Sequence, residues 1–311
     1  MPDQILVIGS SNTDMVVKAE KLPAPGETVM GGTFLMNPGG KGANQAVAAA
    51  RLVEASKGGS VTFVAKVGND IFGKQALDGF EREGINTTYV QTDSDHPSGV
   101  ALINVDASGE NSITVAPGAN ANLLPEETEA ALQSAEPGAL VLLQLEIPLP
   151  TVEYVVRRAA ERGLRVILNP APAQTLPPDL FPHLFLITPN ETEAELLTGV
   201  RVVDLATAEK AAQKLHEMGV SNVVITLGSK GAYLTTNSQS GQLVETPVVK
   251  AIDTTAAGDC FNGALTVALS EGKTLADAVT FACRAASVSV TRMGAQASAP
   301  YRHELEPLLS K

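Results

Sequence analysis

The sequence predicts an α/β fold: three layers, α/β/α, built on a mostly parallel sheet, with a small discontinuous β lid. The first observation is that short, continuously apolar segments alternate with segments of helical periodicity, as in sheets that are covered on both faces. The second is that 311 residues, 44% of them hydrophobic, suffice for one large domain with a substantial core. The third is that several β-rich segments lack helices between them. We therefore expect one domain over residues 1–311.

The main sheet and its helices follow from the alternation. The expected strands span residues 4–8, 61–67, 139–143, 165–169, 184–188 and 222–226. The expected helices span residues 43–52, 71–83, 125–135, 151–162, 191–197, 206–218, 258–271 and 275–291. Gly219 follows one of these helices directly, and glycine readily adopts the left-handed conformation that ends a helix.

The lid is expected from β-like segments that break the alternation, at about residues 14–19, 31–37, 98–105 and 111–115. The last two are joined by the turn-rich tetrad Asp106-Ala-Ser-Gly109, which predicts a hairpin. These pieces are far apart in the sequence, yet they can pair into one small extra sheet over the main domain. The alternative is that they add edge strands to the main sheet.

Composition excludes several classes of protein. The formal charge is −12, from 22 Lys and Arg against 34 Asp and Glu, which argues against a nucleic-acid surface. No stretch approaches the about 18 consecutive apolar residues that a membrane span needs. Cys260 and Cys283 are too few for a disulfide framework or a metal cluster, and the N-terminus shows no cationic, cleavable apolar segment. We expect a cytoplasmic protein that binds neither nucleic acid nor membrane.

The strongest local signal is Asp253-Thr-Thr-Ala-Ala-Gly-Asp259, which opens an apolar helix. The amides of Ala256, Ala257, Gly258 and Asp259 would converge at the helix N-terminus, where unpaired N–H groups and the helix dipole favour anions. A carboxylate repels a bound phosphate, so its presence beside one suggests a role in the chemistry. Accepting a proton from an attacking hydroxyl is such a role, so Asp259 is a candidate general base. The alternative is a helix-capping acid after a tight turn.

A glycine-rich segment spans residues 37–45, Asn-Pro-Gly-Gly-Lys-Gly-Ala-Asn-Gln, and enters a helix. It is not a P-loop, because Lys41 is followed by Gly42 rather than by Ser or Thr. Its small residues would let a polyol lie against the backbone, with Lys41 and Asn44 as hydrogen-bond donors. The alternative is a flexible loop with a solvated lysine.

Polar residues follow two of the expected strands. Asn12 and Asp14 come after the first strand, and Glu146 follows the strand at 139–143. Ligands of open α/β sheets sit at the carboxyl ends of strands, and these side chains suit sugar hydroxyls. Each is equally compatible with an ordinary turn or strand end.

Two further segments suggest a nucleotide and its metal. Asn190 and Glu193 have the spacing of a helix capping box, and the pair also suits a Mg²⁺ ion that keeps most of its waters. In Thr226-Leu-Gly-Ser-Lys-Gly231, the glycines would let a nucleotide pass close to the backbone. The alternative for this second segment is a hairpin turn into the next strand.

The motifs matter most as an ordered set: Asn12 and Asp14, then residues 37–45, 169–173 (Asn-Pro-Ala-Pro-Ala), 188–193 (Thr-Pro-Asn-Glu-Thr-Glu), 226–231 and 253–259. Together they resemble the ribokinase-like carbohydrate kinase family, over about residues 5–300. The resemblance implies the α/β domain with its β lid and a homodimer that pairs lid to lid. It also implies ATP-dependent phosphorylation of the 5-hydroxyl of D-ribose, with ATP, Mg²⁺ and K⁺ in the reaction.

The resemblance also assigns roles to matching positions, with Asp259 as the base. The positions implied to hold ribose are Asn12, Asp14, Gly40, Lys41, Gly42, Asn44, Glu146 and Asp259. Those implied to meet ATP are Asn190, Thr226, Leu227, Gly228, Ser229, Lys230, Gly231, Gly258 and Cys283. Those implied to hold K⁺, several through backbone carbonyls, are Asp253, Thr255, Ser289, Arg292, Gly294 and Ser298. Three positions depart from the usual pattern of the family: Cys283, Ala256 and Ser289.

Three other functions remain open at this point. One is a kinase that acts on another sugar or on a nucleoside, although the chain has no Trp and only 4% aromatic residues for a nucleoside platform. Another is a non-catalytic sugar-binding or sensor protein on the same fold, against which the presence of Asp259 speaks. The third is a nicotinamide dehydrogenase, which is disfavoured because the turn after Ile8 lacks the dinucleotide-binding glycines.

Overall fold

A computed structural model describes residues 4–54, 58–237 and 239–309. Its main sheet has nine strands in the order β13-β12-β11-β10-β9-β8-β1-β4-β5. These strands are β1 (Gln4–Ile8), β4 (Ser60–Gly68), β5 (Asn86–Asp93), β8 (Leu140–Leu143), β9 (Arg165–Leu168), β10 (Leu186–Ile187), β11 (Asn222–Thr226), β12 (Ala232–Thr236) and β13 (Gln239–Val244). Pairing is parallel from β5 to β11 and antiparallel at β12 and β13. The predicted mostly parallel sheet is confirmed.

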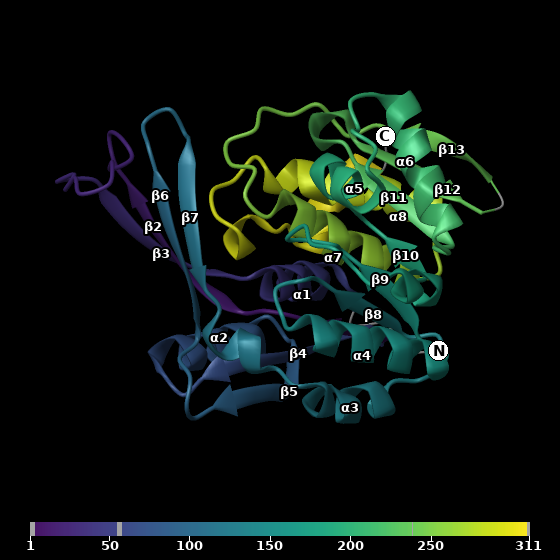
Figure 1. Cartoon of the computed structure of the whole chain (residues 1–311), viewed down its shortest axis with the longest axis horizontal. Helices are drawn as coiled ribbons and strands as arrows, with labels where there is room; N and C mark the ends of the chain where they lie inside the picture. Colours follow the sequence, from purple (N-terminus) through teal and green to yellow (C-terminus); the bar gives the residue numbers. More distant parts are fainter. Residues whose placement is uncertain (1–3, 55–57, 238, 310–311) are drawn as a thin grey trace.

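Helices cover both faces of this sheet, which confirms the three layers (Figure 1). One face carries α1 (Lys41–Leu52), α2 (Ile71–Arg82), α7 (Ala257–Ser270), α8 (Leu275–Ser289) and α9 (Arg302–Leu309). The other carries α3 (Pro125–Ser134), α4 (Leu149–Glu161), α5 (Glu191–Thr198) and α6 (Leu205–Glu217). Successive residues of β1 alternate between the two cores, with Ile5 and Val7 facing α1 and α7, and Leu6 and Ile8 facing the opposite layer.

Some strands differ from the prediction. The strand β5 was not predicted, because its residues, Asn-Thr-Thr-Tyr-Val-Gln-Thr-Asp, are mostly polar, as a partly exposed edge strand allows. At the other edge β13 was not predicted, and β12 was expected only in the hairpin alternative for residues 226–231. The strand expected at 184–188 is shorter, since only Leu186–Ile187 pairs on both sides.

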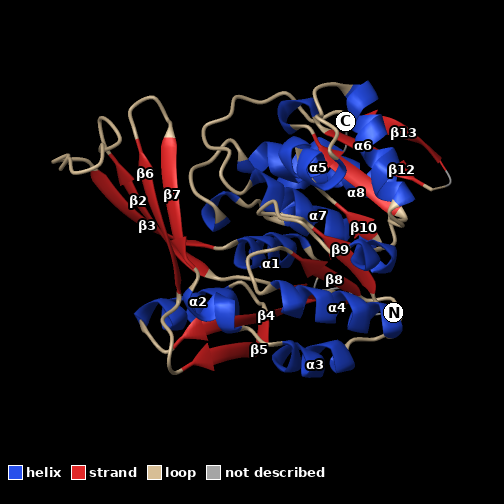
Figure 2. Cartoon of the chain, viewed as in Figure 1, coloured by secondary structure: helices blue, strands red, loops and turns tan. Residues whose placement is uncertain are grey.

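The segments that break the alternation form a separate four-stranded sheet in the order β3-β2-β6-β7, so the edge-strand alternative is wrong. Its strands are β2 (Asn12–Lys18), β3 (Thr33–Gly39), β6 (Gly99–Val105) and β7 (Asn111–Ala116). We call it the lid sheet, after its predicted role. Figure 2 shows it projecting away from the helices and the main sheet. The chain enters it straight from β1 and leaves it into α1, which ties it to the carboxyl edge of the main sheet.

Among the described residues, no helix is both long enough and apolar enough to cross a membrane.

Candidate active site

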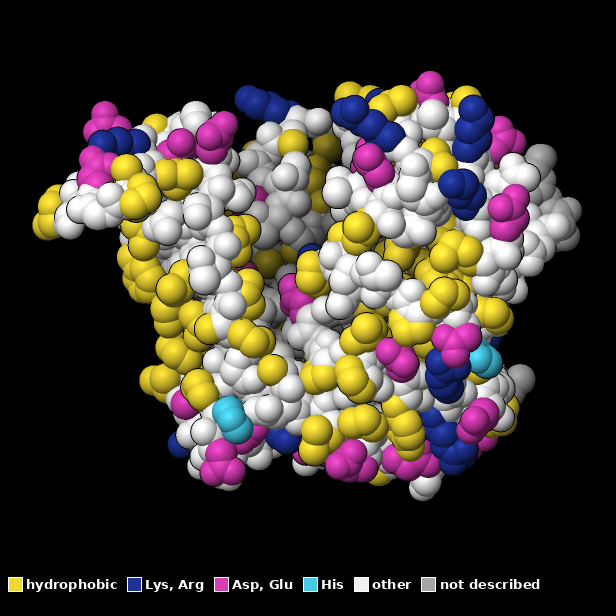
Figure 3. Space-filling model, in the orientation of Figure 1, with side chains coloured by type: hydrophobic (Ala, Val, Ile, Leu, Met, Phe, Trp, Pro, Cys, Tyr) yellow, Lys and Arg dark blue, Asp and Glu magenta, His cyan; other side chains and the backbone are white. Residues whose placement is uncertain are grey.

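The loops after β1, β8, β9, β10 and β11 meet at the carboxyl edge of the parallel strands. The lid sheet stands beside this edge, and Figure 3 shows a hollow between it and the body of the molecule. One cleft of about 620 Å³ is lined by lid-sheet residues, including Asp14, and by residues 251–255 and 293–295 of the body. A second, of about 490 Å³, is lined by Asn12 and Glu146 among others. Of the predicted sugar residues, Asn12, Asp14 and Glu146 therefore border these two clefts.

Asp259 lies in the first turn of α7 and is 6% exposed. Two amides of α1 hold its carboxylate: Asn44 Nδ2 donates to Oδ2 and Gln45 Nε2 donates to Oδ1, each at 2.9 Å. Burial raises the pKa of Asp259, and this outweighs the lowering by Lys41 and by the two amide donors. The carboxylate is thus a stronger base than an ordinary aspartate, and it lies directly against the glycine-rich segment.

The N-terminus of α7 is shaped by Ala256, whose φ of 58° is left-handed. Within the described ranges it is the one non-glycine residue with positive φ, a conformation that costs alanine about 1–2 kcal/mol. The amides of Gly258 and Asp259 then start the helix without acceptors inside it. The Ala257 amide instead donates to the Thr254 carbonyl at 3.2 Å. Of the predicted anion-binding amides, those of Gly258 and Asp259 therefore suit an anion best.

Lys41 begins α1 after Gly40, whose φ is 89°. A Cβ at Gly40 would come within 2.7 Å of backbone, so only glycine fits this turn. Glu146 Oε2 accepts from the Lys41 amide at 3.0 Å and from Ser10 Oγ at 2.6 Å. Burial lowers the pKa of Lys41, but the surrounding carboxylates, Asp259 first, raise it overall. The amine is therefore charged and surrounded by acids.

Asn12 and Asp14 stand on β2 of the lid sheet. Asn12 Oδ1 accepts from Asn120 Nδ2 at 2.8 Å. Burial, together with two nearby carboxylates, raises the pKa of Asp14 to about 6. A Cβ at Gly39 would lie 2.3 Å from the Asp14 carboxylate, so that glycine makes room for it. The structure brings the predicted sugar set to one edge: Asn12, Asp14, Gly40, Lys41, Gly42, Asn44 and Glu146.

Asn190 and Glu193 form the capping box at the start of α5. Glu193 N donates to Asn190 Oδ1 at 2.8 Å, and Asn190 N donates to Glu193 Oε2 at 2.9 Å. Asn190 also forms a bridge to Thr226, which places it beside the predicted nucleotide segment. Burial raises the pKa of Glu193, although the Asn190 amide and Lys41 oppose this. Both residues therefore cap α5, and Glu193 Oε1 takes no part in the capping box.

The predicted nucleotide segment borders a cavity of about 910 Å³, lined by Leu227, Ser229 and Lys230 among others. Residues Gly228–Lys230 form a short 3₁₀ helix, and the segment also links the antiparallel strands β11 and β12, as the hairpin alternative expects. Cys283 does not line this cavity. It is buried, which raises the pKa of its thiol to about 12.

Residues 2–302 of the chain match the family model of the pfkB family carbohydrate kinases. The chain belongs to this family. Its resemblance to carbohydrate kinases, predicted from the motifs, is thereby confirmed.

Within the pfkB family, the chain is similar to kinases of pentose sugars. The chain is 45% identical to a ribokinase of Haemophilus influenzae, covering 98% of this chain and 97% of that one. It is 38% identical to a deoxyribokinase of Salmonella typhimurium, covering 98% of each. It also resembles the structure of Arabidopsis thaliana ribokinase complexed with ribose and ATP, with a TM-score of 0.90, 33% identity and full coverage of both chains.

Four of the positions of this pfkB kinase that were predicted to hold K⁺ lie on two loops: Asp253 and Thr255 before α7, and Arg292 and Gly294 after α8. Asp253 joins them, because its Oδ1 accepts from the Thr255 amide and its Oδ2 from the Gly294 amide, each at 2.9 Å. The guanidinium of Arg292 pairs with Glu304, and its backbone amide donates to the Ser289 carbonyl at 3.0 Å. Two further positions are buried serines whose hydroxyls donate to carbonyls one turn back, Ser289 and Ser298.

Several buried polar residues at the site were missed. Ser10 and Gln144 follow apolar strands directly, a position that could have identified them. Gln45 stood within the glycine-rich segment without an assigned role. Asn120 lies in the 3₁₀ helix η2 (Gly118–Asn122), and nothing in its local sequence indicates that it holds Asn12.

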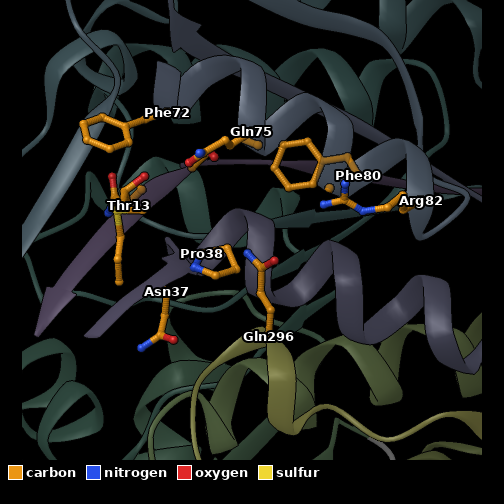
Figure 4. Close-up of a pocket in the computed structure, with 13 residues that line it drawn as sticks. Thr13, Asn37, Pro38, Phe72, Gln75, Phe80, Arg82 and Gln296 are labelled. Carbon is orange, nitrogen blue, oxygen red and sulfur yellow. The ribbon is translucent and has the colours of Figure 1, made fainter. Parts of the chain in front are cut away.

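A separate hollow of about 360 Å³ lies behind the lid sheet (Figure 4). It is lined by Thr13 and Pro38 from the lid sheet, by Phe72 and Phe80 from α2, and by Gln296. Because Thr13 and Asp14 are neighbours on one strand, their side chains point to opposite faces. This hollow is therefore distinct from the cleft that Asp14 lines.

Proposed function

We propose that this chain transfers the γ-phosphoryl group of ATP to the 5-hydroxyl of D-ribose, giving D-ribose 5-phosphate and ADP. The observation that carries the proposal is the buried Asp259 at the N-terminus of α7, in contact with Asn44 of the sugar set. The likeness to ribokinases supports the choice of substrates. The proposed base, a helix N-terminus with unpaired amides and a cleft with polar side chains occur together, which supports phosphoryl transfer to an alcohol.

The sugar would lie among Asn12, Asp14, Lys41, Asn44 and Glu146, all of which carry donors or acceptors for hydroxyl groups. Asn44 gives the clearest support, because its Nδ2 donates to Asp259 while its buried Oδ1 lacks a partner. A buried acceptor without a donor is costly, and a sugar hydroxyl would satisfy it. Gly40 and Gly42 would let the sugar approach the backbone.

In the reaction, the O–H bond of the 5-hydroxyl breaks and its proton passes to Asp259. The same oxygen forms a bond to the γ-phosphorus as the bond to the leaving oxygen of ADP breaks. The amides of the anion-binding turn, Ala256 to Asp259, would stabilise charge on the phosphoryl oxygens, with Gly258 and Asp259 best placed. Because burial raises the pKa of Asp259, proton acceptance is easier than for an ordinary aspartate.

ATP would lie along the cavity at Thr226, Leu227, Gly228, Ser229, Lys230 and Gly231, and reach Gly258 past Asn190. Cys283 is buried, so it would affect the adenine indirectly, by supporting the residues that cover it.

Asn190 and Glu193 fit a water-bound Mg²⁺, because the buried Glu193 keeps one carboxylate oxygen outside the capping box. Within the described residues no three His, Cys, Asp or Glu side chains gather as direct ligands, so few protein ligands are available. When bound, Mg²⁺ would neutralise charge on the nucleotide phosphates.

The predicted K⁺ positions would offer backbone carbonyl and side-chain oxygens, which suit a hard monovalent cation, while the Arg292 guanidinium is turned to Glu304. Asp253 ties their two loops together through backbone amides, so a cation there would further order the turn that leads to Ala256. K⁺ would thus act on the anion-binding turn without touching either substrate.

The lid sheet would exclude water from the cleft and pair with the lid sheet of a second copy. Its outer face exposes Val17, Phe34, Met36 and Leu102, and such apolar patches mark interfaces. Sedimentation of Phe34→Glu beside the unchanged chain tests the homodimer; a dimer that persists in the variant would count against it. The expected location is the cytoplasm, which cell fractionation would test.

The deciding experiment measures ADP release with D-ribose, fructose, 2-deoxy-D-ribose and adenosine. Greatest kcat/KM with D-ribose is expected. The second candidate is 2-deoxy-D-ribose, because a Salmonella relative of similar coverage is a deoxyribokinase. Sugar binding without ADP release would indicate a non-catalytic sugar-binding protein, and preference for fructose or adenosine would contradict the pentose assignment.

A further inference from the structure

Behind Asp259 lies a chain of buried neutral amides that the proposed reaction does not use. Gln45 and Gln144 are fully buried, and Asn169 is 7% exposed. Gln45 Nε2 donates both to Asp259 Oδ1 at 2.9 Å and to Asn169 Oδ1 at 3.0 Å. Gln144 Nε2 donates to Gln45 Oε1 at 2.6 Å. The Gln45 side chain thus donates two hydrogen bonds through Nε2 and accepts one at Oε1.

These contacts allow only one orientation of the Gln45 amide. Asn169 Nδ2 donates to the Thr188 carbonyl at 3.2 Å, which turns Asn169 Oδ1 toward Gln45. If the Gln45 amide were reversed, its oxygen would face the Asp259 carboxylate and Asn169 Oδ1, and its NH₂ would face the NH₂ of Gln144. The pairings with Asp259 and Asn169 are repulsive. The pairing with Gln144 could be relieved by a reversal of the Gln144 amide, because its buried Oε1 has no hydrogen-bond partner. The Thr188 carbonyl after β10 therefore fixes Asn169, Asn169 fixes Gln45, and Gln45 directs its N–H group at Asp259.

The charges around Asp259 make this neutral support important. Lys41 on α1 faces it as a cation, while Glu146 after β8, Asp14 on the lid sheet and Glu193 on α5 add negative charge. Cys260, its neighbour on α7, is a buried thiol. With acids outnumbering the single amine, the amide donors are what stabilise the ionised carboxylate from the interior side.

We propose that Gln45, oriented by Asn169 and held in place by Gln144, is a positioning residue that fixes the Asp259 carboxylate and stabilises its ionised form. The inference rests on the proposed function only in taking Asp259 as the base. Gln45 touches neither substrate in this account, so it acts through Asp259 alone.

The test replaces the donor by a side chain of similar size, Gln45→Met. Carbon-13 NMR titration follows the Asp259 carboxyl signal, identified by its loss in Asp259→Asn. The pKa of Asp259 is expected to rise by about one to two pH units, because one hydrogen bond to the charged form is lost. The acid limb of the kcat/KM profile should move by the same amount. The matched control is Gln133→Met, an exposed glutamine of α3, which should shift neither quantity.

The outcomes separate this inference from the proposed function. An unchanged carboxyl pKa in Gln45→Met would overturn the inference. A raised carboxyl pKa with an unmoved acid limb would support the positioning role and instead remove Asp259 as the base. Should Gln45→Met fail to fold by circular dichroism, Gln45→Glu keeps the shape and adds a second carboxyl, so an upward pKa shift is again expected.

Gln144 gives an independent check, because it should act only through Gln45. Gln144→Met is expected to raise the pKa of Asp259 by less than Gln45→Met does. The double variant should then shift it no further than Gln45→Met alone. Fully additive shifts would show that Gln144 does not hold Gln45 in place and would overturn that part of the proposal.

Discussion

Replacing Asp259 by asparagine removes the proposed base and changes little else in shape. In the unchanged chain, Asn44 Nδ2 and Gln45 Nε2 donate hydrogen bonds to the Asp259 carboxylate. An asparagine offers one acceptor oxygen, so one donor faces an NH₂ group, a cost of about 1–3 kcal/mol. Against this, the variant no longer buries an ionised group. We expect a stability close to that of the original chain, retained ribose binding, and a kcat lowered by about 10²–10⁴-fold.

The assay is coupled ADP release at saturating ATP and D-ribose, with ribose affinity measured separately by calorimetry. The matched control is Asp179→Asn, which changes an exposed carboxylate paired with Arg157 and should leave kcat unaltered. A kcat of Asp259→Asn within a few fold of the original would refute the assignment of the base. Loss of ribose binding together with kcat would instead show that Asp259 mainly holds the sugar.

Three further changes probe the site. Gly39→Ala puts a Cβ 2.3 Å from the Asp14 carboxylate, so we expect the KM for D-ribose to rise about tenfold, while Gly79→Ala, whose Cβ would have open space to 3.8 Å, should not change it. Asp14 keeps its proton to about pH 6 in the fold but only to about 3.8 when unfolded, so its contribution makes the free energy of unfolding fall as pH rises through that window. Denaturant titrations of Asp14→Asn should lack this fall, and an unchanged pH dependence would contradict it. Exchanging K⁺ for Na⁺ should lower kcat with little change in ribose affinity, and equal rates in both buffers would argue against an ordered cation loop at Asp253.

Much of the fold could be predicted from hydrophobic patterning, and the exceptions have physical reasons. The buried central strands are continuous apolar runs, so β1 was predicted to its ends. The edge strand β5 is polar because solvent covers one side of it, and its pattern therefore resembles a loop. Pairing between distant segments leaves no local pattern, so the lid sheet and an edge of the main sheet could be distinguished only by the structure.

The candidate site was predictable where a residue follows a strand or opens a helix, as for Asp14, Glu146 and Asp259. The supporting amides were not, because Gln45 and Gln144 look like ordinary polar residues until the fold brings them together across 99 positions of sequence. Cys283 illustrates the converse: its place in the chain implied a contact with ATP, although its residue type departs from the family's pattern, and the structure buries it.

The direct passage of the chain from β1 into β2 has a mechanical consequence. Asn12 and Asp14 belong to the lid sheet, whereas Lys41, Glu146 and Asp259 belong to the body. A swing of the lid sheet away from the body would withdraw Asn12 and Asp14, which are proposed to hold the pentose, while leaving Lys41 and the proposed base in place. Departure of the phosphorylated sugar and entry of solvent would then be coupled in one movement.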